Sequence, residues 1–109
     1  KGETMFDAMK SFFNPPSVSA HEVKNNINKG SSILLDVRET KERTIHHIPG
    51  SIHIPVGELK NRLNELMPNK DKKIITYCAS GTRSAMATAI LNENGFTALN
   101  MTGGMSAYL

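Results

Sequence analysis

The sequence predicts an α/β domain in which a parallel sheet carries helices on both faces. Three observations lead to this prediction. Short apolar runs alternate with helical patterns about five times along the chain. These runs are continuously apolar, as in strands that are buried on both sides. No internal repeat or long linker interrupts the alternation, and 109 residues is the size of one domain.

Residues 1–16 are expected to form an N-terminal extension, and residues 17–109 to form the α/β domain. An amphipathic helical spacing is present in the extension at Met5, Phe6, Met9, Phe12 and Phe13. Asp7 and Lys10 interrupt the apolar run, so we interpret it as a surface helix and not as a targeting signal. The apolar face would cover the domain, rest on a membrane surface or allow self-association with a second copy.

The first half of the domain contains the following expected elements. Ser17-Val18 leads into Ser19, the expected N-cap of a helix, because Glu22 follows three residues later. Gly30 is expected to end this helix. Next come a buried strand over 33–37, a polar helix over 39–45 and a short strand over 52–55, which Pro55 stops.

The second half begins with a helical pattern in which one face carries Leu59, Leu63, Leu66 and Met67. Pro68 is expected to terminate that helix. The remaining elements are a strand over 74–77, a helix over 84–94 that Gly95 closes, a strand over 97–101 and a short C-terminal helix after Gly103-Gly104.

Composition narrows the classes of function. The net charge is +3, no long basic run occurs, aromatic residues make up 6% of the chain and Trp is absent. These features argue against a nucleic-acid partner and suit small anions better. No apolar run is long enough for an integral membrane helix. A single cysteine excludes an internal disulfide and favours a reducing compartment, so we expect cytoplasmic localisation.

That single cysteine, Cys78, directly follows the predicted strand 74–77. Ligands in such folds bind outside the carboxyl ends of the parallel strands. The backbone can curl around the sulfur because the next residues are small: Ala79, Ser80 and Gly81. Amides at the start of the following helix lack intrahelical partners, and Arg83 adds a positive charge. We therefore expect a low-pKa thiolate and not an inert core cysteine.

Three segments resemble the motifs of rhodanese-domain sulfurtransferases. Cys78-Ala79-Ser80-Gly81-Thr82-Arg83-Ser84 is similar to the family's active-site loop, Cys-x-x-Gly-x-Arg followed by Ser. Asp36-Val37-Arg38-Glu39 resembles the family's DVRE element. His47-Ile48-Pro49-Gly50-Ser51, followed by Ile54-Pro55, resembles its GHIPGAxxIP element. The closing GG-x-x-AW resembles Gly103-Gly104-Met105-Ser106-Ala107-Tyr108. The segments follow the family order and extend the resemblance from about Val18 to Leu109.

The resemblance implies a three-layer α/β/α sandwich on a five-stranded parallel sheet and a sulfur-transfer activity without a cofactor. Cys78 would attack the sulfane sulfur of a small anionic donor, thiosulfate or a persulfide. The amides of residues 79–83 would hold the resulting persulfide, and Arg83 would orient the donor. Ser80 and Thr82 would add hydroxyl donors or shape the loop. Cyanide, an external thiol or a protein cysteine would accept the sulfur, since no second cysteine is present.

Three positions depart from the family pattern. Arg43 stands where Phe or Tyr is usual, His46 where Gly precedes the His, and Tyr108 where Trp is usual. Neither Arg43 nor His46 belongs to the loop, so we expect these two changes to affect local packing, and Tyr108 for Trp keeps an aromatic residue.

Two other functions stay open as alternatives. The first is a cysteine-based phosphatase or arsenate reductase, whose loops place five residues between Cys and Arg. Four residues lie between Cys78 and Arg83, and no Asp lies in an obvious general-acid loop. The second is a non-catalytic binding module, against which the retention of both residues argues.

Other polar residues receive structural interpretations. His46, His47 and His53 lack the additional ligands of a metal site, so no metal is expected. Arg38 and Glu42 have the spacing of an i, i+4 ion pair. Asp36 is expected to make structural hydrogen bonds. The sequon that begins at Asn100 is interpreted as coincidental.

Overall fold

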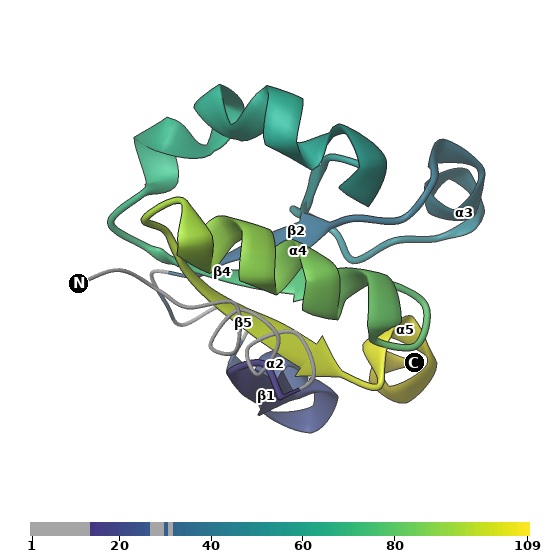
Figure 1. Cartoon of the computed structure of the whole chain (residues 1–109). Helices are drawn as coiled ribbons and strands as arrows, with labels where there is room; N and C mark the ends of the chain where they lie inside the picture. The colour runs from purple at the N-terminus through teal and green to yellow at the C-terminus, as the bar shows by residue number, and fades with distance from the viewer. Residues whose placement is uncertain (1–13, 27–29, 31) are drawn as a thin grey trace.

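The computed structural model describes residues 14–26, 30 and 32–109 (Figure 1). The amphipathic pattern between Met5 and Phe13, with the three alternatives for what its apolar face covers, lies outside the described residues. Ten elements follow one another in the described part: β1 (Ser17–Ser19), α2 (Ala20–Asn26), β2 (Ser32–Asp36), α3 (Thr40–Ile45), β3 (Ile52–His53), the 3-10 segment η1 (Val56–Asn69), β4 (Lys73–Tyr77), α4 (Thr82–Glu93), β5 (Thr97–Thr102) and α5 (Gly104–Tyr108).

The strands form one parallel sheet in the order β1-β5-β4-β2-β3. β4 and β2 lie inside the sheet and are its most apolar strands, with Ile74 and Leu35 fully buried. The carboxyl ends of all strands lie at one edge because every pairing is parallel. The predicted five-stranded parallel sheet is therefore confirmed.

Helices cover both faces of this sheet (Figure 1). On one face, α4 and η1 pack a core that includes Leu59, Leu66 and Leu91. On the other face, α2 and α5 pack around Val23 and Met105. Burial of these side chains removes apolar surface from water on both sides of the strands, which is the main favourable contribution to folding such a layered domain. The three-layer α/β/α arrangement is also confirmed.

The segment before β4 differs from the predicted helix. Val56–Asn69 is a 3-10 helix with a kink at Arg62 (φ −125°, ψ 18°), and Pro68 lies inside it. Proline has no N–H group, but a 3-10 turn continues past it because the Lys70 amide donates to the Met67 carbonyl at 3.1 Å. The prediction that Pro68 terminates the helix was therefore wrong. Leu59 and Leu66 are buried as expected, whereas Met67 is 50% exposed.

The other boundaries differ from prediction by one or two residues. Ser19 caps α2 as expected: its Oγ accepts a hydrogen bond from the Glu22 amide at 3.0 Å. The described part of this helix runs to Asn26. Residues 27–29, which separate Asn26 from the expected end at Gly30, are outside the described residues. Helix α4 begins at Thr82, two residues earlier than predicted. This earlier start brings the first helical turn close to Cys78.

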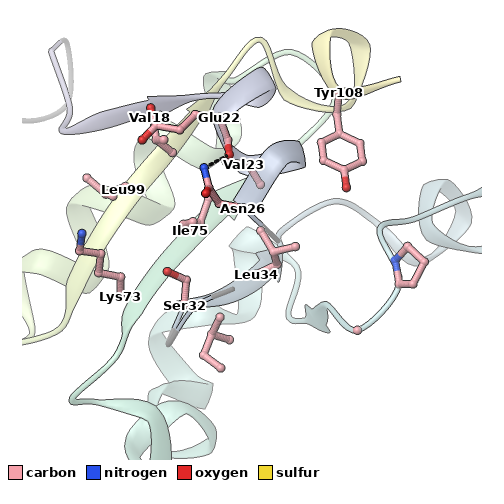
Figure 2. A pocket seen from close by; sticks show the side chains of 14 residues that line it. Val18, Glu22, Val23, Asn26, Ser32, Leu34, Lys73, Ile75, Leu99 and Tyr108 are labelled. Atoms are coloured by element: carbon pink, nitrogen blue, oxygen red, sulfur yellow. Dashed lines mark hydrogen bonds between the residues drawn. The ribbon is translucent and has the colours of Figure 1, made fainter. Parts of the chain in front are cut away.

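A cavity of about 650 Å³ opens on the face of the sheet that α2 and α5 cover (Figure 2). Its apolar lining includes Val18, Val23, Leu34, Ile75, Leu99 and Tyr108. No residue from 78 to 84 lines this cavity, so it is separate from the predicted loop. Across the described residues, no helix combines the length and apolar character needed to cross a bilayer.

Candidate active site

Cys78 leaves β4 at the carboxyl edge of the sheet, and the chain turns at once into α4. Gly81, at the N-cap of α4, makes the turn with φ 117°, a conformation that other residues adopt at a cost. The start of α5 is hydrogen-bonded to this turn. The amides of Met105 and Ser106 donate to the carbonyls of Cys78 and Ala79 at 2.8 and 3.1 Å.

Gly104 is what allows α5 to approach the loop so closely. A Cβ atom at this position would collide with the Cys78 carbonyl oxygen and lie 2.7 Å from the carbonyl carbon and oxygen of Ala79. The second glycine of the closing motif therefore has a specific physical role, because only a residue without a side chain fits beneath the loop.

The sulfur of Cys78 receives hydrogen bonds from the turn that follows it. The Gly81 amide donates to Sγ at 3.0 Å, and the Ser84 amide and hydroxyl donate at 3.4 Å. Cys78 is only 1% exposed and also packs against the core beneath α4. Its neighbours' N–H groups nevertheless point at the sulfur, an arrangement that an anion requires and an inert buried thiol does not.

These donors determine the direction of the pKa shift. Burial alone raises the pKa of the Cys78 thiol, but the hydrogen bonds from Ser84, Gly81 and Ser80 outweigh it, and the pKa lies below its ordinary value. The Ser84 hydroxyl is the largest of these lowering contributions. The site can therefore hold a larger fraction of thiolate at neutral pH than a free cysteine does.

The other predicted loop residues occupy different positions. Ala79 is half-buried, and its carbonyl accepts the hydrogen bond from α5. Ser80 and Thr82 are exposed. Of residues 79–83, Gly81 supplies the short hydrogen bond to the sulfur, and the Ser80 amide contributes to the lowered pKa.

Arg83 is held by Glu42, which projects from α3 on the opposite side of the loop. Both terminal nitrogens of Arg83 donate to the Glu42 carboxylate, at 2.7 and 2.8 Å. The pair lowers the pKa of Glu42 to about 2 and raises that of Arg83. The expected Arg38–Glu42 ion pair was wrong: Glu42 reaches across to the loop, and Arg38 has a closer buried partner.

The family of this chain follows from its similarity to known proteins. Residues 19–109 match the family of the rhodanese-like domain. The chain belongs to the rhodanese family. YrkF of Bacillus subtilis (strain 168) is 40% identical over 92 residues, which cover 83% of this chain and 49% of YrkF. This chain thus spans about half the length of that relative.

Two further relatives support the assignment to this rhodanese group. The thiosulfate sulfurtransferase PspE of Escherichia coli (strain K12) is 35% identical over 71 residues, covering 65% of this chain and 68% of PspE. A rhodanese-like domain protein from Staphylococcus aureus superposes with a TM-score of 0.80 at 33% identity, covering 86% of this chain and 91% of that one. The rhodanese domain described here is homologous to small sulfurtransferases.

The DVRE segment of this rhodanese domain builds a buried charge cluster on the other face of β4. Asp36 is fully buried, and Arg38 binds it through two hydrogen bonds of 3.0 Å. Arg43, in the place of the usual aromatic residue, adds a contact of 3.2 Å to Asp36, and the Tyr77 hydroxyl donates to the same carboxylate at 3.2 Å. Burial raises the pKa of Asp36, but the hydrogen bonds from Arg38 and Tyr77 lower it overall. The expected structural role of Asp36 is confirmed by these contacts.

Two histidines of the rhodanese domain also make structural contacts. A ring nitrogen of His47 lies 3.2 Å from the Arg43 carbonyl, and a ring nitrogen of His53 lies 2.8 Å from the Arg38 carbonyl. Within residues 14–26, 30 and 32–109, no group of three or more His, Cys, Asp or Glu side chains could hold a metal ion.

Three residues contribute to the site in ways that the sequence did not predict: Glu42, Ser84 and Asn100. Ser84 was visible as the last residue of the loop motif, and its position in the first turn of α4 is the signal that indicates a donor. Asn100 accepts the Ser84 hydroxyl at 2.6 Å, although 16 positions separate the two residues. No local pattern indicates Glu42, because its partner Arg83 is 41 positions away.

Proposed function

We propose that this rhodanese domain transfers sulfur through a persulfide on Cys78. The single observation that carries the proposal is the set of donors on the Cys78 sulfur, from Gly81 and Ser84, which favours the anionic form. A thiolate is the form of cysteine that attacks sulfur. The kinship with PspE, a thiosulfate sulfurtransferase, supports thiosulfate as a donor.

The proposed first step is attack of the Cys78 thiolate on the sulfane sulfur of thiosulfate. A new S–S bond forms at Cys78, the S–S bond of thiosulfate breaks, and sulfite leaves with the bonding electron pair. The negative charge then lies on the outer sulfur of the persulfide. Loop amides would stabilise that charge in the way that they stabilise the thiolate.

The second step needs an acceptor from outside the chain, because Cys78 is the only cysteine. A cyanide ion, a thiolate or a protein cysteine attacks the outer sulfur, the S–S bond to Cys78 breaks, and the thiolate returns. The reducing conditions of the cytoplasm would keep Cys78 ready for the next turnover.

Arg83 would attract the anionic donor to the loop that contains Cys78. The residue is partly exposed, with 33% of its side chain accessible, and Glu42 fixes its orientation. An ordered guanidinium binds an anion without the cost of first restricting a long side chain. We propose that Glu42 acts by positioning Arg83 and by moderating its charge.

A phosphatase is the competing reaction for a Cys and Arg on one loop. The four-residue interval between Cys78 and Arg83 supports the smaller sulfur substrate, and both guanidinium ends of Arg83 already bind Glu42. A phosphate ester would have to displace Glu42 to obtain the bidentate contact that Arg usually gives to phosphate.

Turnover with thiosulfate and cyanide tests the proposal. The protein should form thiocyanate and release sulfite in equal amounts, and Cys78→Ser should abolish both. Met86→Ala is a suitable control, because Met86 is on α4 and 46% exposed. Thiocyanate formation that persists in Cys78→Ser, or hydrolysis of an aryl phosphate faster than consumption of thiosulfate, would contradict the proposal.

A further inference from the structure

The Ser84 hydroxyl lies between two acceptors but has only one proton. Its Oγ is 2.6 Å from Oδ1 of Asn100 and 3.4 Å from Sγ of Cys78. A serine hydroxyl donates one hydrogen bond, so both contacts cannot be fully made at once. The shorter contact is within the usual range for O–H···O hydrogen bonds and favours Asn100 as the acceptor.

Asn100 is well placed to compete because its backbone is fixed. It lies in β5, between β1 and β4, and pairs with Ser17 on one side and Thr76 on the other. Its backbone amide also donates to the Pro16 carbonyl at 2.8 Å. The exposed fractions of Ser84 and Asn100 are 0% and 7%, so little water is available to replace either contact.

We propose that Asn100 is a positioning residue of this site: by competing for the only hydroxyl proton of Ser84, it weakens one hydrogen-bond donor to Cys78 and makes the thiolate less favoured than the loop alone would make it. The Gly81 and Ser84 amides cannot be withdrawn in this way, because backbone N–H groups are fixed by the turn. The hydroxyl is the adjustable donor, and it is also the largest single contribution that lowers the Cys78 pKa.

The competition has a consequence for the persulfide, and this part rests on the proposed function. In a persulfide the inner sulfur is bonded to carbon and to the outer sulfur, and the outer sulfur carries the charge. The inner sulfur then no longer needs the Ser84 proton, and Asn100 accepts it. Asn100 therefore stabilises the persulfide relative to the thiolate and favours retention of the sulfur until an acceptor arrives.

Charged groups near the loop do not provide the same adjustment. Arg83 on α4 senses the charge of Cys78, but Glu42 on α3 binds it, and Glu39 lies near that pair. The Asp36, Arg38 and Arg43 cluster is next to Tyr77, whose side chain packs on the opposite face of β4 from Cys78. On η1, Glu58 is bound to Arg62. β5 and α5 carry no charged side chain.

The test measures the rate of iodoacetamide alkylation of Cys78 as a function of pH, without any sulfur donor. Asn100→Leu removes the acceptor and keeps the branching of the side chain, and it should lower the apparent pKa by about half a unit to one unit, a three- to tenfold gain in the thiolate-to-thiol ratio. The same substitution in a Ser84→Ala background should change nothing. Asn64→Leu, at an exposed position of η1, is the matched control.

An unchanged or raised pKa in Asn100→Leu, or an equal shift with and without Ser84, would overturn the proposal. Asn100→Asp provides a second test if the leucine variant does not fold. Its stronger acceptor should raise the Cys78 pKa, and by more in the presence of Ser84 than in its absence; equal shifts would again contradict the proposal.

A persulfide readout separates this inference from the proposed function. At a fixed ratio of sulfite to thiosulfate, intact mass spectrometry should find a smaller persulfide fraction in Asn100→Leu than in the wild type. If no variant forms a persulfide, the proposed function fails, while the alkylation profiles still decide the role of Asn100. An equal or larger persulfide fraction in Asn100→Leu would contradict the inference alone.

Discussion

Glu42 binds both terminal nitrogens of Arg83, at 2.7 and 2.8 Å, and so joins α3 to the first turn of α4 across the loop that contains Cys78. The contact fixes the direction of the guanidinium and neutralises much of its charge. A paired arginine attracts an anionic donor less strongly than an unpaired one but needs less reordering to bind it.

Removal of the Glu42 charge should therefore strengthen donor binding. Glu42→Gln is expected to lower the KM for thiosulfate by about two- to fivefold, the range appropriate to a partly exposed ion pair. Higher salt should reduce the difference because it screens the unpaired charge of Arg83. Glu58→Gln, which disrupts an ion pair on η1, is the control. An unchanged or higher KM in Glu42→Gln would contradict the charge-moderating role of Glu42 and leave only its role in positioning Arg83.

The same ion pair predicts an acid-dependent contribution to stability. The folded-state pKa of Glu42 is about 2, below its ordinary value of 4.5. The contribution is therefore fully present above pH 4.5 and is lost as the pH falls towards 2. The difference in unfolding free energy between wild type and Glu42→Gln, about 0.2–1 kcal/mol at neutral pH, should shrink over that interval. A difference that grows in acid would have the wrong sign.

The reactivity of Cys78 should report its lowered pKa directly. Alkylation is expected to reach half its maximal rate at a pH below that of free cysteine, and Ser84→Ala should move the midpoint upward because it removes the hydroxyl donor. Ser106→Ala, which removes an exposed hydroxyl from α5, is the control. A midpoint at or above the value of free cysteine in the wild type would disprove the anionic site.

Gly104→Ala should destabilise the loop, because α5 packs against the loop at this position. The new methyl group would overlap the carbonyls of Cys78 and Ala79, and the residue would keep an unfavourable φ of 58°. A cost of about 1–3 kcal/mol is expected, with slower persulfide formation because the loop must shift. Gly57→Ala is the matched control, since nothing lies within 4 Å of its added Cβ. Thermal unfolding that is equal in both variants would contradict this packing.

Asp36 should be required for stability and not for the chemistry. Asp36→Ala leaves Arg38 buried without its carboxylate, which is expected to cost about 3–5 kcal/mol. The alkylation midpoint of Cys78 should stay where it is at a temperature where the variant is folded, because the cluster packs on the other face of β4. Chemical denaturation measures the first effect, and a shifted midpoint would indicate a direct role for Asp36.

Local patterns were sufficient for the sheet and for the position of Cys78. Apolar runs identified the buried strands, and the small residues up to Gly81 identified the turn, because both features depend on neighbours in sequence. The segment before β4 was expected to be a regular helix because its leucines recur at intervals of four and three residues, but it forms 3-10 turns that are kinked at Arg62 and continue past Pro68. A proline limits which hydrogen bonds form but does not prevent every helical turn.

The partners of the loop could not be predicted in the same way. Arg38 and Glu42 have the sequence spacing of a helical ion pair, but in the structure Arg38 binds Asp36 and Glu42 binds Arg83. Such choices depend on which side chains the finished sheet brings together. Asn100 looked like a chance sequon, and its contact with Ser84 exists only once β5 lies beside β4.

The most direct measurement is the intact mass of the purified protein after incubation with thiosulfate and removal of excess reagent. The wild type should gain the mass of one sulfur atom at Cys78, lose it on addition of cyanide, and show no gain in Cys78→Ser. A wild-type protein that stays unmodified while Cys78 remains free to react with iodoacetamide would contradict the sulfur-transfer account.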